Sequence, residues 1–162
     1  FVRLIQRGQP LSGNESSGAK DLRIDVAYKY SNGSNLDPAN IAQGTDFYAE
    51  VKVTHPGTRP IRYDEMVLNQ IFPSGWEIIN TRFEGFGSTG SSRADYVDIR
   101  DDRVYTFFDL RENATLTYRV NLNAAYQGRY YLPAVSSEAM YDKSIFALKS
   151  GRWVEVREPE GI

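Results

Sequence analysis

Few residues in this chain have the chemistry that catalysis or metal binding requires. His55 is the only histidine, and it sits in the turn-like sequence Thr-His-Pro-Gly. The chain has no cysteine, and a zinc site without thiolates would need several carboxylates beside the histidine. Because no such carboxylates cluster near His55 in the sequence, we expect a solvent-facing turn residue there and no bound metal or cofactor.

A catalytic nucleophile or a pair of catalytic acids has no clear support in the sequence. There is no Gly-x-Ser-x-Gly elbow, the usual sign of a hydrolase serine. Asp101 and Asp102 are adjacent, but neighbouring strand residues point to opposite faces, whereas a retaining glycosidase needs carboxyl groups about 5 Å apart. Because Arg100 and Arg103 flank the pair, we expect a charged turn. The sequence therefore predicts that the chain is not an enzyme and has no catalytic residues.

Aromatic side chains make up 13% of the residues, and two interpretations of them remain open. Exposed together on one sheet face, they would form a platform on which sugar rings stack, as in carbohydrate-binding modules. Otherwise they pack in the core or at sheet edges, which is the commoner outcome because large exposed aromatic patches are rare. The residues concerned are Trp76, Tyr126, Tyr130, Tyr131 and Trp153.

Met140 and Tyr141 form an apolar pair inside the otherwise polar stretch Pro133–Ser144, PAVSSEAMYDKS. This stretch lies between two strand-like runs, at 128–132 and 145–148, so we interpret it as a connection between strands. Either the pair is tucked under its own domain or it is offered to a partner, and both hold if Met140 faces inward and Tyr141 outward. Pro133 would rigidify the exit from the first run and help to present the loop.

A period of two in hydrophobicity predicts the elements that position these residues. Leu22, Ile24, Val26, Tyr28 and Tyr30 share one face of a strand, and the same alternation recurs at 47–54, 104–110 and 116–122. Weaker strand patterns cover residues 65–72, 76–80, 96–100, 128–132 and 152–157. Turn residues separate these runs. We therefore expect an all-β fold, an antiparallel two-sheet β-sandwich with at most a short helical turn at 37–43.

Length and composition bound the organisation of the chain. We expect its 162 residues to form a single domain over 1–162, with a partly flexible segment at 1–20 and a second loose run at 85–93. Because there is no initiator Met, we expect a fragment of a larger protein. A net charge of −2 without clustered Lys and Arg argues against nucleic-acid binding. No run approaches the ~18 apolar residues of a membrane span, and the lack of cysteine fits an oxidising envelope compartment.

Five segments of the second half, taken in order, resemble one known module. They are Leu68–Asn80 with its Pro-Ser-Gly-Trp-Glu-Ile, Asp101–Leu110 with Asp-Arg-Val, Tyr118-Arg-Val, Gly128–Val135, and Glu138-Ala-Met-Tyr-Asp. Upstream, Gly8-Gln-Pro-Leu and Ala42-Gln-Gly-Thr-Asp-Phe-Tyr fit the opening of the same module. The module is the last macroglobulin-like domain of the bacterial alpha-2-macroglobulins, which the chain resembles over nearly its whole length. It departs from the pattern at Asn121, where a second Arg is frequent nearby, at Pro133, a single Pro where two are usual, and at Lys143, where a Pro often follows Tyr-Asp.

The resemblance implies a function based on contact. Members of the family are large envelope proteins, often lipid-anchored, that trap proteases: a bait segment is cut, the molecule rearranges, and a Cys–Gln thioester in another domain captures the attacker. The terminal domain performs no chemistry and packs on the thioester domain, where a loop Tyr beside a Met keeps water from the thioester. On this chain the resemblance places that interdomain, thioester-shielding loop at Glu138, Met140, Tyr141 and Asp142.

The resemblance also implies partners and a compartment. The partners are the thioester domain and the other domains of the parent chain, with proteases as targets of the full-length protein. No nucleic acid and no direct membrane contact by this domain are expected. The expected location is the periplasm or cell envelope. The alternative is a carbohydrate-binding module of a bacterial envelope protein, and a hydrolase with unrecognised catalytic groups is a third hypothesis.

Overall fold

The computed structural model describes residues 15–79 and 91–159. Within those ranges the chain forms thirteen β-strands and no helix. The strands are β1 (Gly18–Lys20), β2 (Arg23–Tyr30), β3 (Ile41–Ala42), β4 (Asp46–Thr54), β5 (Tyr63–Ile71), β6 (Trp76–Ile78), β7 (Tyr96–Ile99), β8 (Arg103–Leu110), β9 (Thr115–Ala124), β10 (Gly128–Leu132), β11 (Val135–Ala139), β12 (Phe146–Lys149) and β13 (Arg152–Arg157).

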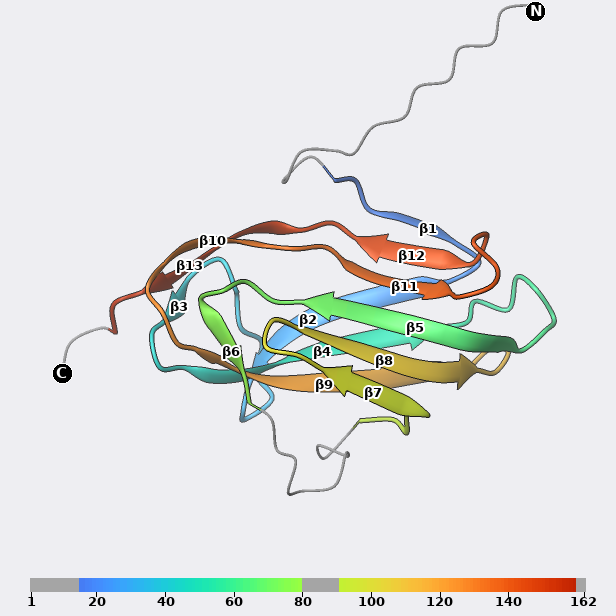
Figure 1. Ribbon diagram of the computed structural model, residues 1–162, viewed down its shortest axis with the longest axis horizontal. Coiled ribbons are helices and arrows are strands. Elements are labelled where there is room, and N and C mark those ends of the chain that lie inside the picture. The colour runs from blue at the N-terminus through green and yellow to red at the C-terminus, as the bar shows by residue number, and fades with distance from the viewer. Residues whose placement is uncertain (1–14, 80–90, 160–162) are drawn as a thin grey trace, which may run out of the picture.

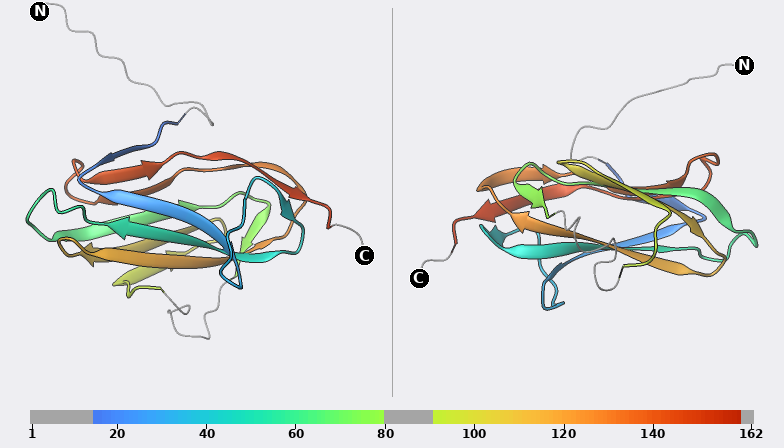
Figure 2. Two further views of the ribbon diagram at one scale, coloured as in Figure 1. Left: turned by 180° about the vertical axis from the view of Figure 1, so that it is seen from behind. Right: turned by 60° about the horizontal axis from the view of Figure 1, so that its bottom comes forward.

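The strands form two layers (Figures 1 and 2). One layer is a six-stranded sheet in the order β1-β12-β11-β5-β8-β7, and the other is a four-stranded sheet in the order β2-β4-β9-β6. A small sheet, β10-β13-β3, continues the β11–β12 hairpin beyond a break in both strands. Every ladder of the described strands is antiparallel except the short pairing of β13 with β3. The predicted antiparallel two-sheet β-sandwich is confirmed.

The ends of the sandwich carry different elements. In Figure 1 the β11–β12 connection and the β4–β5 connection lie at the right-hand end. The small sheet of β10, β13 and β3 lies at the left-hand end. The β10–β11 and β12–β13 strand pairs therefore run along much of the molecule, and each links features at opposite ends.

Alternating burial explains why these segments are strands. In β4 the inward side chains of Phe47, Ala49, Val51 and Val53 are at most 2% exposed, and β8 and β9 alternate in the same way. The inward residues form two apolar clusters, one including Phe47 and the other including Val51 and Val53. The alternation fails at the end of β2, where Tyr30 was expected to face inward but is exposed.

Glu50 is a charged residue that is buried on the outer side of β4. Only 4% of it is exposed, and its carboxylate pairs with Lys29 Nζ at 2.8 Å and with Arg119 Nη2 at 2.7 Å. The Arg119 guanidinium also lies over the ring of Tyr48, 5.1 Å from its centroid. The hydrogen bond from Lys29, supported by that from Arg119, lowers the pKa of the Glu50 carboxyl despite the opposing effect of burial. The sheet therefore carries a compact ion-paired cluster on its outer face.

Three strands lie where the sequence predicts irregular structure. β3 occupies part of 37–43, where at most a short helical turn was expected. β1 occupies the end of the predicted flexible segment and pairs Gly18 with Leu148; residues 1–14 lie outside the described part. β11 lies inside Pro133–Ser144, so the interpretation of that whole stretch as a connection is wrong. β11 is a central strand, bonded to β5 and β12. Most of the loose run predicted at 85–93 lies outside the described residues.

His55 is buried, and the expectation of a solvent-facing residue is wrong. Only 1% of it is exposed, and its ring stacks on Tyr63 with centroids 3.8 Å apart. The Gly57 amide donates to Nδ1 at 3.0 Å, so the proton lies on Nε2, which donates to the Ile61 carbonyl at 2.9 Å. The histidine therefore turns back into the core and closes the connection between β4 and β5.

We predict that His55→Ala lowers the free energy of unfolding by about 1–3 kcal/mol, because it removes both hydrogen bonds and opens a cavity beside Tyr63. Urea unfolding at pH 7 measures the change. The exposed Lys52→Ala on β4 is the control and should stay within about 0.5 kcal/mol of the wild type. Equal losses in the two variants would contradict a structural role for the imidazole.

We predict that Glu50→Gln lowers the free energy of unfolding by about 1–3 kcal/mol at pH 7. Because the Glu50 pKa is lowered in the folded state, its stabilising contribution is present above the unfolded-state pKa and is lost as the pH falls through the folded-state pKa. The difference between Glu50→Gln and wild type should therefore shrink as the pH is lowered from 7 through the folded-state pKa, measured by urea unfolding. The exposed Glu158→Gln should give no such trend; a gap for Glu50→Gln that widened on acidification would refute the assignment.

Candidate functional site

The loop that follows β11 carries the most exposed apolar side chains of the predicted site. Met140 is 46% exposed and Tyr141 is 84% exposed, and the loop ends at Ile145, which is buried. The hypothesis that the pair is tucked under its own domain is therefore wrong. The mixed arrangement, with Met140 inward, is also wrong. Both side chains are presented at the end of the sandwich.

Asp142 folds the loop back on itself directly after the apolar pair. Its Oδ1 accepts hydrogen bonds from the Ser144 amide at 2.9 Å and from the Ser144 hydroxyl. Its own carbonyl accepts from the Ile145 amide at 3.0 Å. The hydrogen bonds from the Ser144 side chain and amide lower the pKa of the Asp142 carboxyl. This turn, in which an aspartate accepts from the backbone two residues on, is the usual role of Asp in short loops.

Arg59 ties the same loop to the β4–β5 connection. Its Nη1 lies 3.1 Å from Asp142 Oδ2, its Nη2 donates to the Ser144 hydroxyl at 2.9 Å, and its Nε lies 2.9 Å from Asp21 Oδ2. One guanidinium thus joins three separate segments of the chain. Because all its partners are partly exposed, we expect this cluster to fix the position of the loop more than to add stability.

A β-bulge in β5 supplies the second anchor of the loop. The pairing of β5 with β8 shifts register between Tyr63 and Met66, and Glu65 has φ 54°, a left-handed conformation that is uncommon outside glycine. The Glu65 amide donates to Asp109 Oδ1 at 3.0 Å, and the Glu65 carbonyl accepts from the Met140 amide at 3.0 Å. The bulge therefore holds the backbone at the start of the exposed pair.

Asp109 holds the bulge in place from the neighbouring strand. Besides the Glu65 amide, its carboxylate binds Arg62, which also pairs with Asp64 at 2.7 Å. The amide hydrogen bond from Glu65, followed by the bond from Arg62, lowers the pKa of the Asp109 carboxyl. These contacts stabilise a backbone conformation that would otherwise be strained.

The structure brings three of the four predicted site residues together. Met140, Tyr141 and Asp142 share the loop, whereas Glu138 lies within β11, where it pairs with Val67 and Phe146 across the outer face of the six-stranded sheet. Pro133 lies at the other end of β11, between β10 and β11, so the expectation that it helps to present the loop is wrong.

Sequence reasoning missed Arg59, Glu65 and Asp109, which hold the loop. Arg59 lies 83 residues from Asp142 along the chain, and no local pattern connects the two. The bulge gives a faint signal, because Tyr63 and Met66 are both buried although three residues apart, which a regular strand does not allow. The Asp-Lys-Ser turn at 142–144 could have been recognised from the sequence.

The other sequence-based candidates have ordinary structural roles. Asp102 pairs with Arg103 at 2.7 Å in an exposed turn, as expected for a charged connection. Trp76 is 3% exposed and packs edge-on against Phe47, so the proposed aromatic platform is wrong for that residue. Among the described residues, no group of three or more His, Asp or Glu is placed to hold a metal ion. None of them forms a helix that is long and apolar enough to cross a membrane.

Of the other residues of the predicted aromatic platform, Tyr126 is exposed and donates its hydroxyl to Glu77, and Tyr130 donates to the Gln127 carbonyl. Tyr131 and Trp153 lie together. Their rings meet edge-on with centroids 5.6 Å apart, and the Arg129 guanidinium covers the Trp153 ring at 4.9 Å. Tyr131 also donates its hydroxyl to Glu15. Since Arg129 already occupies one face of the indole and Tyr131 its side, the group offers little flat surface for a sugar ring.

Comparison with known proteins gives concordant results for sequence and fold. Residues 22–143 match the family described as "Bacterial Alpha-2-macroglobulin MG10 domain". The alpha-2-macroglobulin of Pasteurella multocida (strain Pm70) is 25% identical over 148 residues, which cover 91% of this chain. The chain spans 7% of the length of the curated relatives that it matches.

Two solved structures share the fold. Native alpha-2-macroglobulin from Escherichia coli, spanning domain MG7 to the C-terminus, superposes with a TM-score of 0.78 at 18% identity, covering 93% of this chain and 25% of that chain. Salmonella alpha-2-macroglobulin reacted with methylamine gives a TM-score of 0.77 at 20% identity, covering 91% of this chain and 10% of that chain.

We predict that Arg59→Gln loosens the 140–145 loop while changing the free energy of unfolding by less than about 1 kcal/mol. Without the guanidinium, the Met140 and Ile145 amides should exchange with solvent faster, because their hydrogen bonds open more often. Hydrogen exchange followed by NMR measures this. Lys143→Gln, in the same loop and exposed, is the matched control. Unchanged exchange at both amides in Arg59→Gln would show that the bulge alone holds the loop.

Proposed function

The chain belongs to the bacterial alpha-2-macroglobulin MG10 domain family, and on that basis we propose that it is a non-catalytic interaction domain. It packs on the thioester-containing domain of its parent chain and shields the thioester from water. The protein as a whole acts as a protease inhibitor, with proteases as its targets. In this proposal, the surface that makes the contact is the loop of Met140 and Tyr141.

The observation that carries the proposal is the exposure of Tyr141 on a fixed loop. A tyrosine that is 84% exposed gains little from its own domain, because almost none of its ring is removed from water. Its backbone is nevertheless held on both sides, by Glu65 before it and by Asp142 and Arg59 after it. An exposed apolar side chain on an ordered support is what a contact surface for another domain requires.

The chemistry of a thioester explains why this pair of residues suits the function. A thioester is lost by attack of water, so its cover must exclude water without reacting. Tyrosine supplies a flat apolar ring with one polar hydroxyl, and methionine adapts to an irregular partner surface. Because Asp142 and Arg59 already order the loop, docking costs less conformational entropy than it would for a mobile loop.

The remaining parts of the proposal concern chemistry and location. The domain contributes by contact and takes no part in bond formation, which is why its loop carries an apolar pair and not a nucleophile. We place the protein in the periplasm or cell envelope, as part of a lipid-anchored parent chain. The lack of cysteine in the chain supports an oxidising compartment.

The test uses the full-length parent protein, whose sequence upstream of this domain should contain a Cys-x-Glu-Gln thioester motif. We predict that Tyr141→Ala speeds the spontaneous loss of methylamine-reactive thioester by about tenfold, equivalent to about 1.4 kcal/mol of lost protection. Methylamine is the appropriate probe because a relative of the same fold, from Salmonella, has been reacted with it. The rate of thiol appearance in buffer measures the loss.

Two further variants sharpen the test. Tyr141→Phe keeps the ring and removes the hydroxyl, so protection retained in this variant assigns the shielding to the apolar ring. Tyr96→Ala removes another exposed tyrosine, on β7, and should leave the rate unchanged. If Tyr141→Ala decays as slowly as the wild type, the loop has no part in protecting the thioester.

A further inference from the structure

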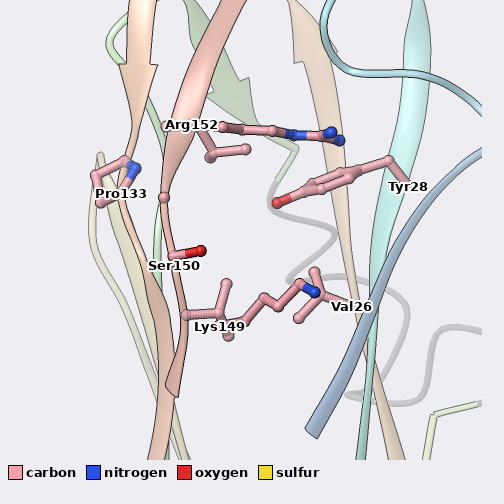
Figure 3. Close-up of a pocket in the computed structure, with 9 residues that line it drawn as sticks. Val26, Tyr28, Pro133, Lys149, Ser150 and Arg152 are labelled. Carbon is pink, nitrogen blue, oxygen red and sulfur yellow. The ribbon is translucent and has the colours of Figure 1, made fainter. Parts of the chain in front are cut away.

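A cavity of about 360 Å³ lies between the two layers (Figure 3), at the start of β11, whereas the exposed loop follows the end of that strand. Its volume is in the range of small-molecule sites. Val26 and Tyr28 line it from β2, and the break between β10 and β11 lines it from the other layer. The apolar part of the lining comes from Val26, Leu132 and Val135. No step of the proposed function uses this cavity.

The cavity results from a bend in the long hairpin. Pro133 and Ala134 separate β10 from β11, and Ser150 and Gly151 separate β12 from β13. A Cβ at Gly151 would lie 2.5 Å from the Leu132 carbonyl oxygen, so the strands approach too closely here for any other residue. Ser17 fixes the bend by accepting a hydrogen bond from the Ser150 amide at 3.0 Å. The cavity is therefore part of a fixed backbone arrangement.

Tyr28 is the central polar group of the cavity. It is 7% exposed, and its hydroxyl points across the cavity towards Ser150 (Figure 3). Burial raises the pKa of the Tyr28 hydroxyl above its ordinary value, so the group stays protonated and able to donate. The hydroxyl faces the cavity (Figure 3) and is available to donate to an acceptor bound there. A ligand that supplied an acceptor would satisfy it.

Two cationic side chains border the same space. Lys149 from β12 and Arg152 from β13 both line the cavity and extend towards β2 (Figure 3). The nearest carboxylate to the Arg152 guanidinium is Asp37, at 3.9 Å in an exposed pair, which leaves most of its donors available. A protonated hydroxyl, an ammonium group and a guanidinium therefore line one cavity together with apolar side chains, and this combination favours an anion.

We propose that this cavity binds a small organic carboxylate with a short apolar body. The carboxylate accepts hydrogen bonds from the Tyr28 hydroxyl and from the Lys149 and Arg152 side chains. The apolar body packs on Val26, Leu132 and Val135. The proposal does not depend on the function proposed for the loop, because the two sites share no residue.

The test is a calorimetric titration of the 162-residue chain with octanoate, octanol and inorganic phosphate. We expect saturable binding of octanoate with a Kd below about 1 mM, and at least about tenfold weaker binding of octanol and of phosphate. Octanol lacks the charge and phosphate lacks the apolar body. An absence of saturable octanoate binding, or equally tight binding of octanol or of phosphate, overturns the proposal.

Matched variants locate the binding. Tyr28→Phe removes one oxygen and retains the packing, and Arg152→Gln changes an exposed side chain. Each should weaken octanoate binding by about tenfold, while the exposed Lys52→Gln should not change it. Binding that is unaffected by both Tyr28→Phe and Arg152→Gln places the ligand elsewhere and refutes the site.

Discussion

Burial of alternate side chains between two sheets constrains every other feature of this molecule. Because the side-chain period of a strand is two, the register of each ladder cannot slip without exposing the core. β5 breaks that period once: Tyr63 and Met66 both point inward although they are three positions apart. The extra residue is absorbed by the left-handed Glu65, whose carbonyl then accepts from the Met140 amide. The position of the exposed loop is therefore a consequence of how the core is packed.

The long hairpin from β10 to β13 connects the two sites of interest. At one end the turn between β11 and β12 carries Met140 and Tyr141 on a support of hydrogen bonds. In the middle, the ladder is interrupted at residues 133–134 and 150–151, and the hairpin bends and leaves the cavity beside Tyr28. One hairpin thus supplies an ordered contact surface at its turn and a cavity at its bend.

The sequence predicts the strands whose apolar residues recur at every second position, and it misses a strand in which polar residues occupy a buried position. β4, β8 and β9 follow from their apolar period, and β10 and β13 were predicted with the bounds that they have. β11 was missed because Ser136, Ser137 and Glu138 hide its pattern, although Ser137 is buried.

The burial of His55 could not be foreseen, since its hydrogen-bond partners are backbone groups of Gly57 and Ile61 in a loop. The exposure of Met140 and Tyr141 was left undecided because an apolar pair in a loop is compatible with either outcome. The support of the 140–145 loop by Arg59 was not predicted, because it depends on contacts between parts of the chain that are distant in sequence.

The position of β5 has a consequence for biogenesis. Its two neighbours in the sheet are β8, which is made soon after it, and β11, which is among the last segments to be made. While the nascent chain emerges, the edge of β5 that later pairs with β11 has amides and carbonyls without hydrogen-bond partners. Such an edge is prone to pair with other chains. Late, long-range closure of this kind is also slow. The pairing of β11 with β5 therefore closes a sheet edge that stays open until residues 135–139 have been made.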